Sequence, residues 1–319
     1  MSALKRIRKA LEVVLVRIGL LFIPMLPRRG VVRLARVAGW LGYYLSPRLR
    51  NVGKANLDIA FQEHRTPREK KKILQESFQT FALVTLDILW FSRHSAKRIP
   101  AHVRFDPGLD EVFQHKPHIC ITAHLGNWEL LGHAVSLKGY PLHSVAAPLA
   151  NPAVEPLFHQ IRSVSGQRIL ARNGAVRGML KALKAKEKVG LLLDQNIKPS
   201  KGGVFLDFFG LPAPVSDAAA TLALRTQTDI LFGFCIPDRD GSYYVHTAEK
   251  ITPDRYASEE REQAVRACTF DIVHVIENAI RTHPGAWLWM YKRWKYRTPG
   301  VDPNRYPFYA GNRKKAVNQ

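Results

Sequence analysis

Cysteine is scarce and scattered in this chain of 319 residues. The three cysteines, Cys120, Cys235 and Cys268, form no CxxC pair. This excludes a disulfide framework and a paired-cysteine zinc site. We therefore expect free thiols in a reducing compartment.

Acidic residues are also few, with 26 Asp and Glu against 48 Lys and Arg. The net charge is +22 and the pI is about 10.2. Such an excess of positive charge requires an anionic partner. The candidates are nucleic acid, an acidic membrane surface and a phosphorylated substrate. With 46% hydrophobic residues, the chain can form one large domain or two modest ones, and global disorder is excluded.

The N-terminal region lacks a clean membrane span. Residues 10–27 are as long as a spanning helix but contain Glu12, Arg17 and Pro24. Residues 1–54 contain twelve Lys and Arg but a single acidic residue, Glu12. No small-x-small cleavage site of a signal peptide follows the apolar segment 10–27. We expect an uncleaved basic helix that lies in, or dips through, the inner face of an anionic bilayer. The alternative is an amphipathic helix packed on the protein's own core.

Several common catalytic motifs are missing. The chain has no GxGxxG after a strand, no Walker loop and no GxSxG elbow. Four histidines lie close together in the sequence, but without paired cysteines or HExxH spacing we predict no metal site. These histidines are His115, His118, His124 and His133.

From residue 118 onward, short apolar runs alternate with helical patterns. The pattern predicts buried strands at 118–123, 144–147, 189–193 and 230–236, separated by helices at 128–138, 154–164, 173–183 and 216–227. Continuous apolar strands separated by helices predict an α/β fold with a mostly parallel central sheet flanked by helices. We also expect a loop at 98–110, an edge strand at 243–247 and a helix at 258–281.

Residues 66–69 have the pattern of a capping box, with Thr66 as the cap, Pro67 in the first turn and Glu69 three residues after Thr66. A helix is therefore expected to begin there and to run toward residue 91. The predicted organisation is a membrane-associating helical region at 1–100, an α/β domain at 101–300 and a basic C-terminal tail at 301–319.

One polar cluster stands at a predicted strand end. His124 leaves the strand 118–123, Gly126 permits a tight turn, and Glu129 falls in the first turn of the next helix. On one regular helix the two side chains would lie about 140° apart, so a non-helical turn is needed to bring them together. We predict a His124–Glu129 dyad with a free imidazole nitrogen as general base, near backbone N–H groups that stabilise an oxyanion. No serine or cysteine stands suitably beside it, which favours direct transfer over a covalent enzyme intermediate.

These residues resemble a known family. The segment 124–129, HisLeuGlyAsnTrpGlu, resembles the His-x4-Asp/Glu motif of the lysophospholipid acyltransferase superfamily, and is similar to the late acyltransferases of lipid A biosynthesis. The likeness continues in order through Asn151-Pro152, Arg162, Gly166, Arg172-Asn173, Asp194-Gln195, Phe208-Phe209-Gly210 and 284–295. Met290-Tyr291 stands where many members have a histidine, and Ala218 where a glycine is usual.

The resemblance implies an enzyme at the cytoplasmic face of the bacterial inner membrane. It would move an acyl chain from acyl carrier protein, or from CoA, to a hydroxyl of a phosphorylated lipid, and no metal or other cofactor is implied. Anionic membrane lipids are further partners, and no nucleic acid partner is expected.

The resemblance also implies roles for single residues. His124 would take the hydroxyl proton and Glu129 would orient His124, while Gly126 and Asn127 would contribute to substrate binding in the turn. Arg162, Arg168 and Arg172 would bind phosphates, with a solvated basic surface as the alternative. Asp194 would orient substrate or an arginine, and Gln195 is assigned to the same site. Trp287, Trp289 and Trp294 are expected to pack in the core or at the membrane boundary.

Two sets of alternatives stay open. Within the same chemistry, the acceptor is a lysophospholipid, an ornithine lipid or another glycolipid instead of a lipid A precursor. From another class, the chain is a non-catalytic binder of anionic lipid or nucleic acid. A nucleic-acid binder would show aromatic residues interleaved with basic ones, and only residues 289–297 have that pattern.

Overall fold

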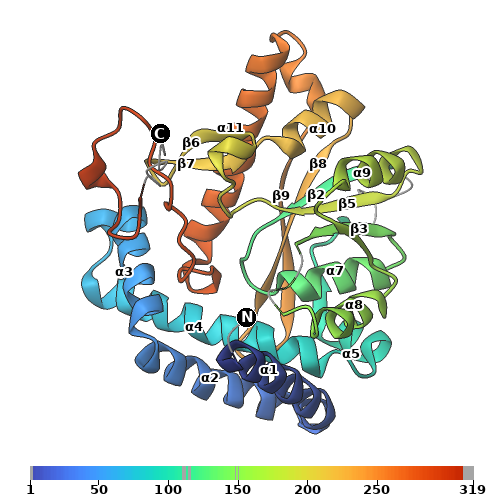
Figure 1. Cartoon of the computed structure of the whole chain (residues 1–319). Helices are drawn as coiled ribbons and strands as arrows, with labels where there is room; N and C mark the ends of the chain where they lie inside the picture. Colours follow the sequence, from blue (N-terminus) through green and yellow to red (C-terminus); the bar gives the residue numbers. More distant parts are fainter. Residues whose placement is uncertain (1–2, 110–112, 114–115, 148, 150, 312–319) are drawn as a thin grey trace.

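The computed structural model describes residues 3–109, 113, 116–147, 149 and 151–311. Its N-terminal part is helical, with α1 (Ala3–Phe22), α2 (Arg28–Leu45), α3 (Pro47–Phe61), α4 (Pro67–Trp90) and α5 (Ser95–His102). Figure 1 shows α1, α2 and α4 side by side along one end of the molecule, beneath the sheet. The helices of the described residues include none that is both long enough and apolar enough to cross a membrane.

The rest of the chain alternates strands and helices around one central sheet. In chain order the elements are β1 (Val103–Phe105), β2 (His118–Thr122), α7 (Trp128–Leu137), β3 (Leu142–Ala146), α8 (Glu155–Ser163), β4 (Arg168–Ala171), α9 (Ala175–Lys184), β5 (Lys188–Leu192), β6 (Gly203–Phe208), β7 (Leu211–Ser216), α10 (Ala218–Thr226), β8 (Ile230–Pro237), β9 (Tyr243–Ile251) and α11 (Arg261–Thr282). This confirms the predicted α/β fold.

The sheet has seven strands in the order β1-β9-β8-β2-β5-β3-β4. All neighbouring pairs are parallel except β8 and β9. The central strands β2 and β8 are almost continuously buried, as expected for a sheet covered on both faces. β2 is thus a central strand. Its carboxyl end lies at the edge of the sheet where the loops that follow the parallel strands come together.

Two apolar clusters cover the two faces of the sheet. One contains α9, α10 and α11 together with the segment of Trp287, Trp289 and Trp294. The other contains α7 and α5 with parts of α2 and α4. Trp287, Trp289 and Trp294 are at most 1% exposed, which confirms the core-packing prediction for them.

Helix α4 begins as the sequence predicts, because the side chain of Thr66 accepts from the peptide N–H of Glu69 and Glu69 caps Thr66 in return. Other local predictions were wrong. Residues 98–110 contain the end of α5 and strand β1, and β9 lies between β1 and β8 instead of at the edge. The helix predicted at 173–183 begins only after Gly174, which is in the left-handed region, and is α9.

The C-terminal segment packs on the body as far as Gly311. Tyr306 is buried and donates to the carbonyl of Pro212, and Tyr309 donates to the side chain of Asn56. The first part of the predicted basic tail is therefore attached to the β6–β7 hairpin and α3. Residues 312–319 lie outside the described residues.

Candidate active site

The turn after β2 is fixed by backbone hydrogen bonds to two other segments. The N–H of Gly126 donates to the carbonyl of Ala286 at 3.0 Å, and the N–H of Asn127 donates to the carbonyl of Cys235 at 2.7 Å. Gly126 has φ +65°, and a Cβ at this position would lie 2.0 Å from the oxygen of Cys235. Only glycine fits here, so the glycine decides where His124 leaves the sheet.

His124 pairs with Asp194, which follows β5. Its Nδ1 lies 2.8 Å from Oδ1 of Asp194, and its backbone N–H donates to Oδ2 at 3.0 Å. The indole N–H of Trp287 donates to the same Oδ2 at 2.8 Å. Three donors thus converge on one carboxylate whose side chain is only 2% exposed.

These donors keep the carboxylate ionised. Burial alone would raise the pKa of Asp194, but the charge of His124 and the hydrogen bonds from His124 and Trp287 outweigh burial and bring the pKa below its usual value. An ionised Asp194 holds the proton on Nδ1 and leaves Nε2 of His124 as the proton acceptor. Nε2 faces the amide nitrogen of Gln195 at 3.2 Å.

Glu129 does not contact the imidazole, which corrects the predicted dyad. It forms a two-pronged ion pair with Arg162, with Glu129 oxygens 2.9 Å from Nε and 2.6 Å from Nη2. The pair is about four-fifths buried on both sides. Within the described residues, the imidazole of His124 hydrogen-bonds only with Asp194 and Gln195. The parallel register of β2 and β5 explains why His124 contacts Asp194. Thr122 and Leu192 are paired, and His124 and Asp194 each lie two residues beyond them.

Two of the backbone N–H groups in the turn do not serve as the predicted oxyanion donors. The N–H groups of Gly126 and Asn127 are already bonded to carbonyls of neighbouring segments. The side chain of Asn127 is 1% exposed, so it does not reach a substrate. Its oxygen caps α7 at the N–H of Leu130, and its amide donates to Asp87 and Tyr243.

A buried ion-pair network therefore stands behind the turn. Asp87 of α4 pairs with Arg28, the first residue of α2, and also accepts from Tyr243. Asp87 is fully buried. Burial raises the pKa of its carboxyl group, although Arg28, Tyr243 and Asn127 act to lower it. Removing one member of such a network leaves a buried charge without its partner, so the network fixes α2, α4 and the turn relative to one another.

The three arginines predicted to bind phosphate lie in different places. Arg162 is beside the site, held by Glu129. Arg168 begins β4, at the sheet edge opposite to His124, and pairs with Glu187, so it does not belong to the site. Arg172 follows β4 at the same edge as His124 and is exposed.

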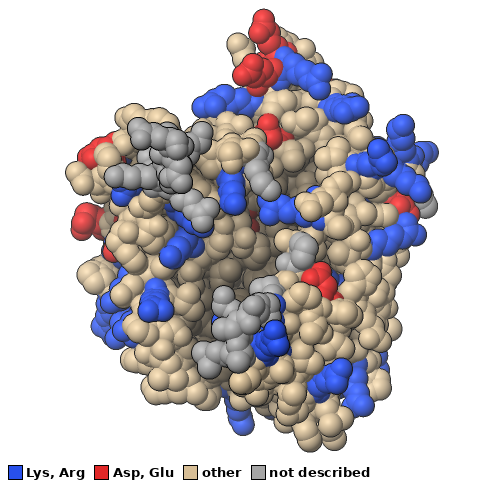
Figure 2. Space-filling view, viewed as in Figure 1, with Lys and Arg blue, Asp and Glu red and all other residues tan. Residues whose placement is uncertain are grey.

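A narrow apolar cavity of about 100 Å³ lies between α7 and the sheet. Its polar lining includes the Glu129–Arg162 pair, and Trp128 also lines it. The centre of the Trp128 ring lies 4.7 Å from the centre of the His124 ring. Its apolar walls include residues from α7, β3, β5 and β8: Leu131, Val135, Leu142, Leu191 and Leu231. Figure 2 shows a hollow over the turn that follows β2, with Lys and Arg around its rim.

The thiols of the region are poor nucleophiles. Cys120 lines the cavity, and burial raises the pKa of its thiol to about 12. Burial raises the pKa of the Cys235 thiol as well. Both are protonated at neutral pH, and the nucleophile in thiol chemistry is the thiolate. In the part of the chain that the structure describes, no group of three His, Cys, Asp or Glu side chains could hold a metal ion.

Sequence reasoning missed the role of Trp287 and gave Asp194 the wrong partner. The signal for Asp194 was available, because an aspartate directly after a buried strand lies beside the end of the neighbouring parallel strand. Trp287 carried no comparable signal, because it lies outside the helices and strands that the sequence pattern predicts, in the segment after the short 3-10 helix Pro284–Ala286.

A histidine that is hydrogen-bonded to an ionised carboxylate beside an apolar cavity is an arrangement suited to general-base catalysis. The profile of the family described as "Bacterial lipid A biosynthesis acyltransferase" matches residues 2–296. The chain belongs to this family, and it is an acyltransferase of the lipid A type.

Individual lipid A acyltransferases are similar to this chain at low sequence identity. The chain is 26% identical over 262 residues to a lipid A biosynthesis palmitoleoyltransferase of Escherichia coli K12, covering 79% of this chain and 81% of that protein. It is 24% identical over 301 residues to a lipid A biosynthesis lauroyltransferase of the same organism, covering 91% and 93%. Among solved structures, the 1-acyl-sn-glycerophosphate acyltransferase of Thermotoga maritima matches at 13% identity with a TM-score of 0.36, covering 81% of this chain and 98% of that one.

Proposed function

We propose that this protein transfers a fatty acyl chain from acyl carrier protein, or from CoA, to a hydroxyl of a lipid A precursor. The transfer is direct and needs no cofactor beyond the acyl thioester. The observation that carries the proposal is the His124–Asp194 pair beside an apolar cavity, in a chain of the lipid A acyltransferase family.

In the proposed reaction, Nε2 of His124 takes the proton of the acceptor hydroxyl as its oxygen attacks the thioester carbonyl. An ester C–O bond forms, the C–S bond breaks, and the imidazolium returns the proton to the leaving thiolate. Asp194 stabilises the imidazolium that forms between these steps. Gln195 stands where the hydroxyl must approach Nε2, so its side chain contacts the acceptor or gives way to it.

Arg162 is the proposed cation for the developing oxyanion or for a phosphate of the acceptor. Two of its three nitrogens are held by Glu129, and Nη1 has no hydrogen-bond partner among the described residues. A guanidinium fixed in this way is preorganised, which is what electrostatic stabilisation of a transition state requires. Glu129 is thus a positioning residue for Arg162, and Arg172 is a second candidate for the acceptor's phosphates.

The cavity beneath α7 is the proposed site of the acyl chain. Its volume of about 100 Å³ and its mostly apolar lining suit an acyl chain. Gly233 on β8 lines it, and the nearest atom to a Cβ at this position is 3.7 Å away, on Leu131. A larger side chain at 233 would therefore extend into the space of the chain.

Gly233→Leu is expected to shift the product toward shorter acyl chains while His124 and Asp194 stay in place. Gly233→Ala, which adds one carbon in ordinary contact with Leu131, is the matched control and should change chain preference little. The measurement is mass spectrometry of products formed from a mixture of acyl donors. An unchanged chain-length distribution in Gly233→Leu would place the acyl chain elsewhere.

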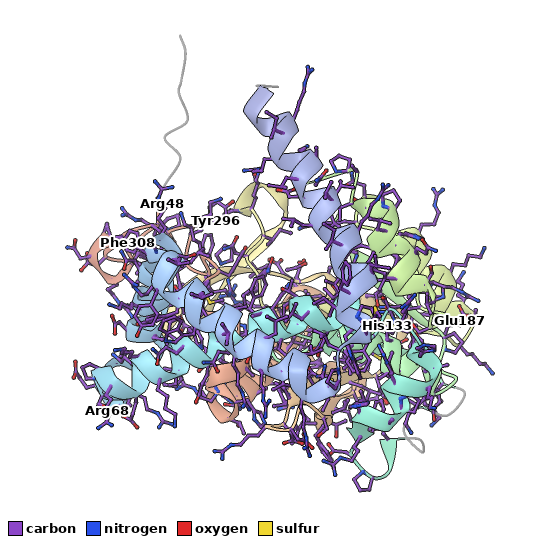
Figure 3. All side chains as sticks on the ribbon, turned by 90° about the horizontal axis from the view of Figure 1, so that it is seen from below. Arg48, Arg68, His133, Glu187, Tyr296 and Phe308 are labelled. Carbon is purple, nitrogen blue, oxygen red and sulfur yellow. The ribbon has the colours of Figure 1, made fainter. Side chains whose placement is uncertain are left out.

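The outer faces of α1 and α2 support binding to the cytoplasmic face of the bacterial inner membrane. Exposed apolar side chains recur at helical spacing on α1, including Ile7, Leu11, Val14, Ile18 and Leu21. A second exposed set on α2 includes Val37, Trp40, Leu41 and Leu45. Figure 3 shows these two helices crossing the near side of the molecule. An apolar stripe between basic residues is the pattern of a helix that lies in an anionic membrane surface.

The experiment that tests the proposal offers the purified protein acyl carrier protein thioesters and Kdo₂-lipid IVA in anionic vesicles. Mass spectrometry should find one added acyl chain, and sedimentation should find the protein with the vesicles. His124→Ala should abolish the addition without releasing the protein from the vesicles. Acylation of a lysophospholipid, an ornithine lipid or a glycolipid in place of Kdo₂-lipid IVA would discard the acceptor, and no acylation of any of these would discard the proposal.

A further inference from the structure

Helices α9 and α10 form a basic groove on the sheet face opposite to α7. Its volume is about 1080 Å³, and eight residues line it: Gly174, Val176, Arg177, Leu180, Lys181, Lys184, Arg225 and Thr226. Arg177, Lys181 and Lys184 follow one another at spacings of four and three residues, so they share one face of α9. Arg225 adds a fourth cation from α10. Figure 2 shows Lys and Arg gathered over α9 at the right of the view.

The four cations have no acidic partner in the part of the chain that the structure describes. Neither α9 nor α10 contains an Asp or Glu, and all four side chains are exposed. Neighbouring basic residues differ in this respect, since Arg162 pairs with Glu129 and Arg168 with Glu187. Like charges three and four residues apart weaken a helix, so the fold itself gains nothing from this arrangement. An anionic partner would offset the repulsion.

The floor and the position of the groove indicate what kind of partner fits. Val176 is 55% exposed, and Leu180 is partly buried beside it, so the groove offers apolar contacts between its cations. Figure 1 places α9 and α10 at the end of the molecule opposite to α1 and α2. A protein that lies on the membrane through α1 and α2 would therefore turn this groove toward the aqueous phase.

The groove runs along α9, and one of its ends lies at the same edge of the sheet as His124, while Lys184 and Arg225 lie toward the opposite edge, where β5 and β8 begin. Gly174 precedes α9 just after β4, and β4 ends at the same edge as β2 and His124. β4 is the third strand from β2 in the sheet. At about 4.8 Å between neighbouring strands, these two strand ends are about 14 Å apart, and an acyl chain delivered from this end of the groove would pass around the edge of the sheet to reach the cavity on the α7 face.

We propose that the α9–α10 groove docks an acidic helix of the carrier protein that delivers the acyl chain. The proposal rests on the proposed function, because it requires a protein-bound acyl donor. Charge complementarity sets the encounter rate, and the apolar floor holds the helix while its arm reaches the cavity. CoA carries no such helix and does not use the groove.

The test is the double variant Arg177→Glu/Lys181→Glu. With acyl carrier protein as donor, KM should rise about tenfold or more at low salt, while kcat stays near the wild-type value. Binding of carrier protein without its prosthetic arm should weaken by a similar factor. Turnover of acyl-CoA, where the wild type accepts it, should change less than twofold.

The matched control is Arg68→Glu/Lys71→Glu, which makes the same change of charge at the exposed start of α4 (Figure 3). It should leave the KM for the carrier protein unchanged. Equal effects of the two double variants, or no effect of the groove variant, would overturn the docking proposal. Weaker binding to anionic vesicles with unchanged carrier kinetics would also overturn it and assign the groove to the membrane. A wild-type protein that accepts only acyl-CoA would instead remove the carrier protein from the proposed function.

Discussion

Asp194→Asn is expected to lower kcat about 10³- to 10⁴-fold with little change in KM. An asparagine keeps the volume of the side chain but removes the negative charge that holds the Nδ1 proton and stabilises the imidazolium. With the wrong tautomer, Nε2 no longer accepts the proton of the hydroxyl. Steady-state kinetics measure kcat and KM separately.

Glu129→Gln serves as the comparison that separates the two carboxylates. Because Glu129 contacts Arg162 and not His124, this variant should lose activity through the displaced guanidinium of Arg162. Its loss should be non-additive with that of Arg162→Lys, since either change breaks the same ion pair. A loss that is additive with that of Arg162→Lys and non-additive with that of Asp194→Asn would restore Glu129 as the partner of the histidine.

Gly126→Ala is expected to destabilise the fold by about 3 kcal/mol or more and to abolish activity. The residue has φ +65°, where an L side chain is strained, and its Cβ would overlap the carbonyl oxygen of Cys235. The overlap is with backbone, so no rotation of a side chain relieves it. The turn must move, and His124 moves with it away from Asp194. Thermal unfolding and the acyl-transfer assay report the two losses.

Gly139→Ala provides the control for this prediction. Gly139 also has a positive φ, +91°, but nothing lies within 4 Å of its added Cβ. This variant should show only the conformational cost, about 1–3 kcal/mol, and should retain activity. A similar activity in the two alanine variants would contradict the view that the close approach at Cys235 positions the catalytic turn.

The sequence by itself determined the layout of the fold and the location of its chemistry. The apolar runs at 118–123 and 189–193 predict buried parallel strands, and both are present as β2 and β5. Because ligands bind where such strands end, His124 and Asp194 were both assigned to one site. The short strands β1 and β4 and the β6–β7 hairpin carry no comparable pattern and were missed. β1 and β4 are only three and four residues long, and pairing with neighbouring strands decides the structure of all these segments.

Only the tertiary structure decided which acid contacts the histidine. In the sequence Glu129 is five residues from His124, whereas Asp194 is seventy residues away. The register of β2 and β5 sets Thr122 against Leu192, and this brings His124 and Asp194 side by side. Glu129 meanwhile turns with the start of α7 toward Arg162 of α8. Nearness along the chain does not determine contact at a strand end, because the partner is selected by pairing between strands that are distant in the sequence.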